Sequence, residues 1–294
     1  MKTYYILYNP TAGDGSCRKD AECLQIIYDN TEMIDLTRIT NYRTFLCGLR
    51  REDVLVIVGG DGTLNRFVND TDGIEISQEI LYLPAGTGND FAKDLGKDGY
   101  GNPFEIGRYL KYLPSVEVKG KCYRFLNGVG FGIDGYCCQV GDELKKIPGK
   151  KVNYTAIAIK GLLFHFDARN AKVTVDRKMY AYQKVWIAPT MHGRFYGGGM
   201  IPTPKQDRTS GELSVMLFHG AGRLRTLCVF PRIFKGAHVK YTKMVAVHTG
   251  REITVEFDRP TSLQIDGETI LNVTKYTARA AVCSVNKTKE KVLC

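Results

Sequence analysis

Short apolar runs alternate with amphipathic segments through the first part of the chain. We predict strands at residues 4–8, 33–36, 54–58 and 80–83, and helices at residues 17–29, 42–49, 64–69 and 90–95. The predicted strands are continuous apolar runs, which is typical of sheets that are covered on both faces. The alternation therefore predicts an α/β domain with a parallel sheet and flanking helices.

The hydrophobic pattern changes after about Gly120. Strand signals then recur at short spacing, at residues 123–129, 171–175, 183–190, 212–219, 245–249, 252–257, 262–265 and 276–282. Helical patterns interrupt them at residues 152–166 and 223–230. We predict a second, mainly antiparallel, β-sandwich-like domain. The domains are placed at residues 1–122 and 123–294, with the option that the C-terminal residues pack back on the first domain.

Composition and charge limit the class of protein, but they do not identify its ligand. The 294 residues are 44% hydrophobic, and 41 basic against 31 acidic side chains leave a net charge of +10. A basic chain suits ATP, an acidic membrane surface or nucleic acid. The nine cysteines form no CxxC pair, which indicates reduced thiols rather than zinc ligands or disulfides. The pattern predicts neither a signal peptide nor a membrane-spanning segment.

Two glycine-rich loops follow predicted strands. Gly59-Gly60-Asp61-Gly62-Thr63 comes directly after residues 54–58, and the run PAGTGNDF at 84–91 follows residues 80–83. Glycines let backbone N–H groups approach phosphate oxygens, and the helix N-terminus that follows adds a favourable dipole. A third loop, residues 8–13, follows the first strand in the same way. Because the carboxyl ends of neighbouring strands form a crevice, we expect the three loops to converge on one phosphate site.

Asp61 is the unusual residue of the first loop, because a carboxylate repels phosphate. Three roles stay open for it: holding Mg²⁺ through water, contacting a nucleotide ribose, or accepting a hydrogen bond from a loop amide. The non-functional alternative is a tight turn with a side-chain-to-backbone bond.

In this order, the motifs resemble the diacylglycerol kinase catalytic domain family, which includes bacterial lipid kinases, sphingosine kinases and ceramide kinases. The matching segments are NPTAG at 9–13, GGDGTLN at 59–65, PAGTGNDFA at 84–92, GGG with a following proline at 197–204, and DGE at 266–268. NAD kinases and phosphofructokinases resemble only the GGDGT part. The resemblance implies an ATP-dependent lipid kinase, most directly a diacylglycerol kinase, with its active site in the cleft between two domains.

The resemblance also implies roles for single residues, with ATP and Mg²⁺ as cofactors. The implied ATP contacts are Asn9, Thr11, Thr37, Gly59, Gly60, Asp61, Gly62, Thr63 and Thr87. Asp266 is the first choice for the general base and Glu268 the second, against the alternative of an ordinary Asp-Gly hairpin turn. Lys160 lies in an otherwise apolar helix, so it is either a phosphate ligand or a surface lysine.

Several positions depart from the family pattern. Asp14 replaces a lysine, which removes a cation from the expected phosphate region unless Arg18 or Lys19 substitutes for it. Arg66 replaces a glutamate and Glu117 replaces an aspartate, which alters the polar network expected between the domains. Relatives also hold a structural Mg²⁺ with an aspartate at the position of Ser210 and with backbone carbonyls. The candidate ligands here are Asp207, Ser210 and Glu212. Because Mg²⁺ prefers anionic oxygen ligands, we predict that this site is weak or lost.

Three rival functions are weighed against a lipid kinase. An NAD kinase would carry a downstream Asn-Glu pair, and none occurs in the sequence. A regulator that has lost catalysis fits the changes at Asp14 and Ser210 but not the retained DGE segment. A nucleic-acid binder has only the net charge in its favour.

A lipid kinase would need partners at a membrane. The expected partners are a lipid alcohol and, peripherally, the anionic inner face of the cytoplasmic membrane. An apolar groove is expected near residues 196–200 and the helix at 152–166, and the basic side chains of Lys145, Lys146, Lys150 and Lys151 would attract anionic lipid.

Overall fold

A five-stranded sheet with the order β2-β1-β3-β4-β5 forms the first domain of the computed structural model, which describes residues 1–10, 12, 16–99, 101–147 and 152–281. All neighbouring strands are parallel except β4 and β5, which are antiparallel. The strands are β1 (Tyr4–Tyr8), β2 (Thr31–Asp35), β3 (Val54–Gly59), β4 (Glu79–Pro84) and β5 (Phe104–Glu105).

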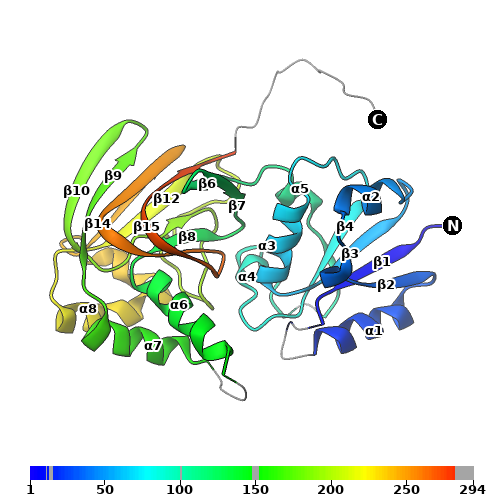
Figure 1. Cartoon of the computed structure of the whole chain (residues 1–294), viewed down its shortest axis with the longest axis horizontal. Coiled ribbons are helices and arrows are strands. Elements are labelled where there is room, and N and C mark those ends of the chain that lie inside the picture. The colour runs from blue at the N-terminus through cyan, green and yellow to red at the C-terminus, as the bar shows by residue number, and fades with distance from the viewer. Residues whose placement is uncertain (11, 13–15, 100, 148–151, 282–294) are drawn as a thin grey trace.

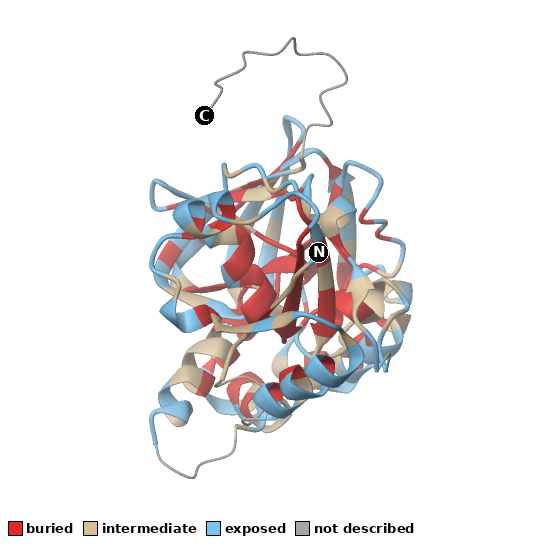
Figure 2. Cartoon of the chain, turned by 90° about the vertical axis from the view of Figure 1, so that its right-hand side faces the viewer, coloured by how far each residue is buried: buried red, intermediate tan, exposed pale blue. Residues whose placement is uncertain are grey.

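Helices cover both faces of this sheet (Figures 1 and 2). They are α1 (Cys17–Ile27), α2 (Tyr42–Cys47), α3 (Asp61–Asp70), α4 (Asp90–Asp94) and α5 (Gly107–Leu110), with a 3₁₀ turn, η2, at Leu36–Arg38. Every residue of β3 is buried. Leu55 and Ile57 face one core, while Val54, Val56 and Val58 face the other. This two-sided burial explains why β3 is a continuous apolar run rather than an alternating one.

The second domain is a ten-stranded antiparallel sheet. Its path runs β13-β12-β11-β8-β14-β15-β6-β7, and β9 joins β10 to β14. The strands are β6 (Ser115–Val118), β7 (Lys121–Arg124), β8 (Gly128–Phe131), β9 (Arg169–Val175), β10 (Lys178–Val185), β11 (Thr190–Met191), β12 (Leu213–Phe218), β13 (Val245–Gly250), β14 (Glu252–Ile265) and β15 (Glu268–Arg279). The predicted fold class, an α/β domain followed by an antiparallel β domain, is confirmed. β6 and the first two residues of β7 precede the boundary expected after residue 122, yet both strands belong to the second sheet.

Helices gather along one edge of the second domain (Figure 1). They are α6 (Ile133–Lys145), α7 (Tyr154–Lys160), the π-helical turn η3 (Gly161–His165), α8 (Arg223–Val229), and the 3₁₀ turns η4 (Phe230–Lys235) and η5 (Ala237–Lys240). α6 was not predicted, because two glycines interrupt its pattern. Gly141 is needed there, since a Cβ would meet the Tyr154 ring at 2.7 Å. Small residues thus allow α6 to pack closely on α7.

Three predicted strand boundaries are wrong. The strand expected at 123–129 is two strands, because the backbone N–H groups between them donate to the Asp266 carboxylate instead of a ladder. The strand expected at 183–190 is likewise split between β10 and β11. The strands expected at 252–257 and 262–265 are one, because a register shift around Pro260 lets β14 continue past the proline.

Candidate active site

The two glycine-rich loops touch each other backbone to backbone. A Cβ on Gly86 would lie 2.5 Å from the Cα of Gly60, closer than any side chain allows. A Cβ on Gly59 would lie 2.6 Å from the Cβ of Thr63. Glycine is therefore required at Gly86 by contact between the loops and at Gly59 by contact with Thr63, in addition to any need for approach to a ligand.

Asp61 holds the second loop in place. Its carboxylate accepts hydrogen bonds from the backbone N–H groups of Asp90 (2.7 Å) and Phe91 (3.1 Å), the first two residues of α4. Burial raises the pKa of Asp61, and these N–H groups oppose the shift. Of the roles left open for Asp61, the structure shows the bond to a loop amide.

A cavity of about 610 Å³ opens in front of these loops, at the junction of the two domains. The first domain contributes Asn9, Ala12, Leu36, Thr37, Tyr42, Gly60, Asp61, Gly62, Thr63, Arg66, Phe67, Gly86, Thr87 and Gly88, and the second contributes Lys145, Tyr154 and Glu268. Seven of the nine expected ATP contacts therefore lie around one cavity. Gly59 packs beneath Thr63 instead, and Thr11 lies outside the described residues.

Two cations line this cavity that were not predicted as ligands. Arg66 follows Thr63 by one turn of α3, and Lys145 is the last residue of α6. Arg66 also pairs with Asp70 at 3.4 Å, and Lys145 pairs with Asp142 at 3.3 Å. Arg66 could have been predicted from the sequence, because residues three apart share a helix face and Thr63 was already an expected ATP contact. No signal was available for Lys145, because α6 was not predicted.

Asp266 is not one of the described residues that line the cavity. Its half-buried carboxylate accepts from the backbone N–H groups of Asn127 (2.9 Å), Gly128 (3.0 Å) and Leu126, and from Asn65 Nδ2 (2.8 Å). Loss of hydration raises its pKa, and the backbone N–H groups counter that. Asp266 and Gly267 both have positive φ, +46° and +97°, and form the two-residue turn between β14 and β15.

The other two catalytic candidates lie in different surroundings. Glu268, the first residue of β15, is exposed and lines the cavity. Lys160, at the end of α7, is exposed to solvent and is not among the lining residues, so it needs no buried anion. The structure thus places Glu268 on the cavity and places Asp266 next to the first glycine loop, bonded to Asn65 Nδ2, whereas Lys160 lies away from both.

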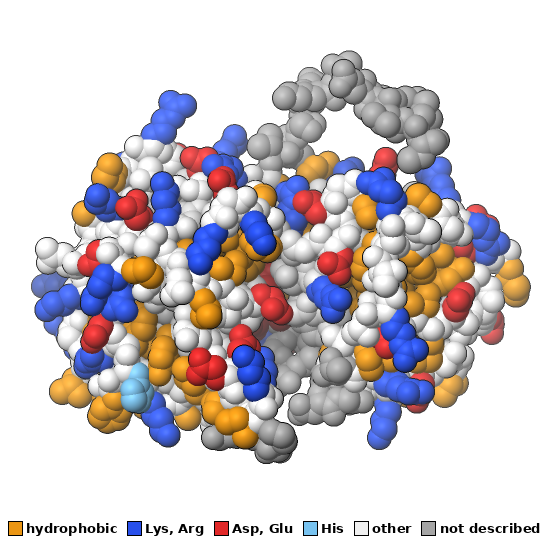
Figure 3. Space-filling view, in the orientation of Figure 1, with side chains coloured by type: hydrophobic (Ala, Val, Ile, Leu, Met, Phe, Trp, Pro, Cys, Tyr) orange, Lys and Arg blue, Asp and Glu red, His pale blue; other side chains and the backbone are white. Residues whose placement is uncertain are grey.

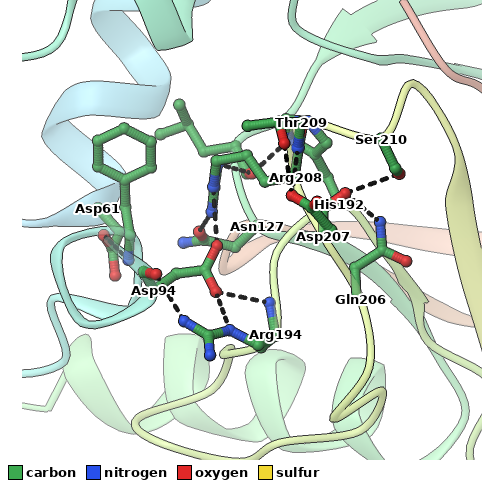
Figure 4. Close-up of polar contacts among 12 residues, drawn as sticks. Asp61, Asp94, Asn127, His192, Arg194, Gln206, Asp207, Arg208, Thr209 and Ser210 are labelled. Carbon is green, nitrogen blue, oxygen red and sulfur yellow. Dashed lines mark hydrogen bonds and ion pairs between the residues drawn. The ribbon is translucent and has the colours of Figure 1, made fainter. Parts of the chain in front are cut away.

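A buried charge network joins the domains beside the cavity (Figure 4). Asp94 at the end of α4 accepts from Arg208 Nε (2.8 Å) and Arg194 Nε (2.9 Å), both in the second domain. Arg208 also donates to the carbonyl of Leu126 (2.9 Å) and to Asn127 Oδ1 (3.1 Å). These cations are the reason that the pKa of Asp94 is lowered despite its burial.

Two family models match the chain. Residues 3–110 match the diacylglycerol kinase catalytic domain, and residues 127–282 match the YegS C-terminal NAD kinase beta sandwich-like domain. The chain belongs to the diacylglycerol kinase catalytic domain family. The resemblance inferred from the motifs is thereby confirmed.

Relatives and solved structures agree with this membership. A Mycobacterium tuberculosis protein named diacylglycerol kinase is 26% identical over 223 residues, which is 71% of this chain and 67% of the relative. A Staphylococcus aureus protein named as a candidate lipid kinase is 28% identical over 74% of this chain and 70% of its own length. A Bacillus anthracis diacylglycerol kinase crystal structure superposes with a TM-score of 0.59 at 18% identity, covering 95% and 94% of the two chains, which shows a shared fold.

The donor set around Ser210 does not fit the structural Mg²⁺ that the family resemblance implies. The Asp207 carboxylate accepts from the N–H (2.8 Å) and hydroxyl (2.7 Å) of Thr209, and these bonds lower its pKa. The Asp207 and Glu212 carbonyls also accept hydrogen bonds from within the loop. Across the described residues, no group of three or more His, Cys, Asp or Glu side chains is placed to hold a metal ion.

Proposed function

We propose that this protein is an ATP-dependent lipid kinase that transfers the γ-phosphate of ATP to a lipid hydroxyl, with diacylglycerol as the acceptor and phosphatidic acid as the product. One observation carries the proposal: Glu268 of the second domain faces the glycine loops of the first across a single cavity. Family membership and the relative named diacylglycerol kinase support it.

The first domain would hold the nucleotide. The N–H groups of Gly60 and Gly62 and the start of α3 suit phosphate oxygens, and Arg66 and Lys145 supply positive charge on either side of the cavity. Mg²⁺ bound with ATP would neutralise charge on the transferred phosphoryl group. Phosphoryl transfer depends mainly on such positioning and charge compensation, which this lining offers.

The second domain would activate the acceptor. As the lipid oxygen bonds to phosphorus and the bond to the bridging oxygen of ATP breaks, the hydroxyl becomes acidic and its proton passes to the Glu268 carboxylate. The products are the phosphorylated lipid and ADP. Glu268 is preferred over Asp266 because each Asp266 oxygen already accepts two hydrogen bonds.

The test is Glu268→Gln, assayed with labelled ATP and diacylglycerol in mixed micelles. Loss of the base should lower kcat about 10²–10⁴-fold with little change in Tm. Glu256→Gln is the control, because Glu256 is an exposed glutamate of the same hairpin away from the cavity. Full turnover by Glu268→Gln together with an inactive but folded Asp266→Asn would reassign the base to Asp266.

The same assay separates ATP from NAD as substrate. Thr63→Ala should weaken ATP use, because Thr63 lines the cavity and accepts from Asn9 Nδ2 at 3.4 Å. Conversion of NAD to NADP by the pure protein, without labelling of any lipid alcohol, would refute a lipid kinase. Binding of ATP and lipid without turnover would instead support a regulator.

A lipid acceptor requires contact with a bilayer. None of the described helices is long and apolar enough to cross a membrane. We therefore propose peripheral contact with the anionic inner face of the cytoplasmic membrane, where ATP and lipid alcohols meet.

A further inference from the structure

One edge of the second domain carries a basic stretch of chain, and the neighbouring Asp167 pairs with one of its cations, Arg223. Residues 219–243 contain six lysines and arginines and no aspartate or glutamate. This stretch includes α8, η4 and η5, and Arg225, Lys235 and Lys240 are exposed on it. An ordinary solvated surface mixes both signs of charge, so this edge creates a local positive potential.

Two large apolar side chains project from the same edge. Phe164 in η3 is 72% exposed and Leu224 in α8 is 74% exposed. Arg223 ties η3 to α8 by donating to the carbonyls of Leu162 (2.9 Å) and Phe166 (2.8 Å). The turn that presents Phe164 is therefore held on both sides while its ring stays in solvent. Figure 3 shows hydrophobic side chains and Lys or Arg gathered along the lower edge, where α7 and α8 lie in Figure 1.

This edge is continuous with the cavity. Tyr154, the first residue of α7, lines the cavity, and η3 follows α7 without a break. Ile159, near the end of α7, is also exposed. A surface bound along α7 and η3 would therefore extend to the cavity mouth.

We propose that the docking edge, defined by Ile159, Phe164, Leu224, Arg225 and Lys235, binds the surface of an anionic lipid bilayer. The proposal rests on the proposed lipid kinase function, since it brings a membrane-borne hydroxyl to the side of the cavity that holds Glu268. Apolar side chains enter the boundary between headgroups and acyl chains, and the cations attract anionic headgroups. The charge of the edge favours this occupant over an apolar protein surface.

Sedimentation with vesicles tests the docking edge. Wild-type protein should bind phosphatidylglycerol-containing vesicles, bind phosphatidylcholine vesicles much less, and lose binding as salt rises. Phe164→Ser/Leu224→Ser should weaken binding at least about tenfold, because each side chain would otherwise be buried in lipid. Met179→Ser/Leu271→Ser is the matched control, because these exposed side chains lie on β10 and β15.

A second readout separates docking from catalysis. The double variant should phosphorylate a soluble short-chain diacylglycerol at the wild-type rate while losing activity on vesicles. Equal vesicle binding by wild type and the double variant would overturn the proposal, as would binding of an acidic protein but of no vesicle. Edge-dependent vesicle binding without phosphorylation of any lipid would uphold docking and refute the proposed function.

A separate observation concerns the loop at residues 206–212. Gln206 is buried, and its Nε2 donates to the carbonyls of Asp207 (3.2 Å) and Glu212 (2.9 Å). The Ser210 hydroxyl donates to the same Asp207 carbonyl at 2.8 Å. Because carbonyl oxygens only accept, the nitrogen of the Gln206 amide must face them. Side-chain donors thus gather the carbonyls at the centre of the loop (Figure 4).

The tied loop presents Arg208 to the first domain. The Arg208 side chain is only 4% exposed and reaches Asp94 at 2.8 Å. We infer that Gln206 and Ser210 take the place of a structural divalent cation, gathering the loop carbonyls with N–H and O–H groups and positioning Arg208. The loop and its contact with Asp94 are therefore independent of Mg²⁺.

Thermal unfolding without nucleotide tests whether Gln206 and Ser210 take the place of a metal ion. Wild-type Tm should be the same in EDTA and in Mg²⁺, whereas Gln206→Ala should lower Tm by several degrees. Gln206→Ala/Ser210→Asp frees the carbonyls and adds a carboxylate, so Mg²⁺ should raise its Tm. Gln78→Ala is the matched control, because buried Gln78 also donates to two carbonyls, of Leu49 and Arg50, and its loss should not create a response to Mg²⁺.

Three results would overturn the inference. These are a fall of wild-type Tm in EDTA, one Mg²⁺ per chain retained after dialysis, and an unchanged Tm for Gln206→Ala.

Discussion

The Asp266 carboxylate is already occupied as a hydrogen-bond acceptor. The two Asp266 oxygens accept four, from Leu126, Asn127, Gly128 and Asn65. Asp266→Asn keeps the size and tolerates the positive φ, but its amide nitrogen cannot accept. We expect the free energy of unfolding to fall by at least about 2 kcal/mol, because two donors lose their acceptor. Urea denaturation measures this, and Asp29→Asn on the surface should change it little.

A second prediction concerns Asp134, whose pKa is raised to about 6 by burial. The folded state holds its proton more tightly than the unfolded chain, so this group's stabilisation is complete below about pH 4 and is lost as pH rises to about 6. Asp134→Asn is neutral throughout. Its stability relative to wild type should therefore grow between pH 4 and pH 7, by about 3 kcal/mol at most.

Urea titrations of both proteins at several pH values measure that difference. Groups common to the two proteins cancel, so the comparison isolates Asp134. Asp29→Asn supplies the exposed control. A difference that stays constant with pH would show that the pKa of Asp134 is the same in the folded and the unfolded protein.

Residues in contiguous motifs could be predicted from the sequence, while residues brought in by other elements could not. Gly60, Gly62 and Thr63 share one short segment, so their convergence follows from local chain geometry. Lys145 reaches the cavity from α6, whose pattern is broken by glycines. Asp266 and Glu268 are two positions apart, and only the turn between β14 and β15 places one in a hydrogen-bond cluster and the other at the cavity.

At the scale of elements, some glycines of the two loops are needed for packing between the loops, and we expect others to be needed only for ligand binding. Gly86→Ala should destabilise the fold by about 1–3 kcal/mol, because its Cβ would strike the Gly60 backbone. Gly62 lies in the first turn of α3, where a Cβ meets no atom within 4 Å. Gly62→Ala should therefore keep or raise stability and weaken ATP binding by crowding the cavity.

Denaturation and ATP titration of both variants measure this contrast. Gly101→Ala is the control, since its Cβ also meets open space and Gly101 does not line the cavity. Equal ATP affinity for wild type and Gly62→Ala would place the nucleotide away from α3.

Strand and helix types were predicted well where burial is uniform and poorly where tertiary contacts override the local pattern. β3 and β12 are buried throughout and were expected from their apolar runs. The break between β7 and β8 depends on Asp266, far away in the sequence, so no local pattern could reveal it.

At the scale of the whole molecule, the buried Arg208–Asp94 pair couples the two domains. Removing one partner of a buried ion pair leaves an uncompensated charge, which commonly costs about 3–5 kcal/mol. Arg208→Met should therefore destabilise the protein, although Arg194 still contacts Asp94 at 2.9 Å. It should also let the domains unfold separately, because Arg208 spans Asp94 and the Leu126 carbonyl.

The single tryptophan gives a local probe of this uncoupling. Trp186 is buried in the second domain, so its fluorescence follows that domain, whereas far-UV circular dichroism follows both. The two urea transitions should coincide in the wild type and separate in Arg208→Met. Arg208→Lys keeps the charge but loses the forked geometry. The separation between its two transitions should therefore be intermediate between those of wild type and Arg208→Met. Arg225→Met is the exposed control and should behave as wild type. Coincident transitions in Arg208→Met would show that the remaining contacts couple the domains.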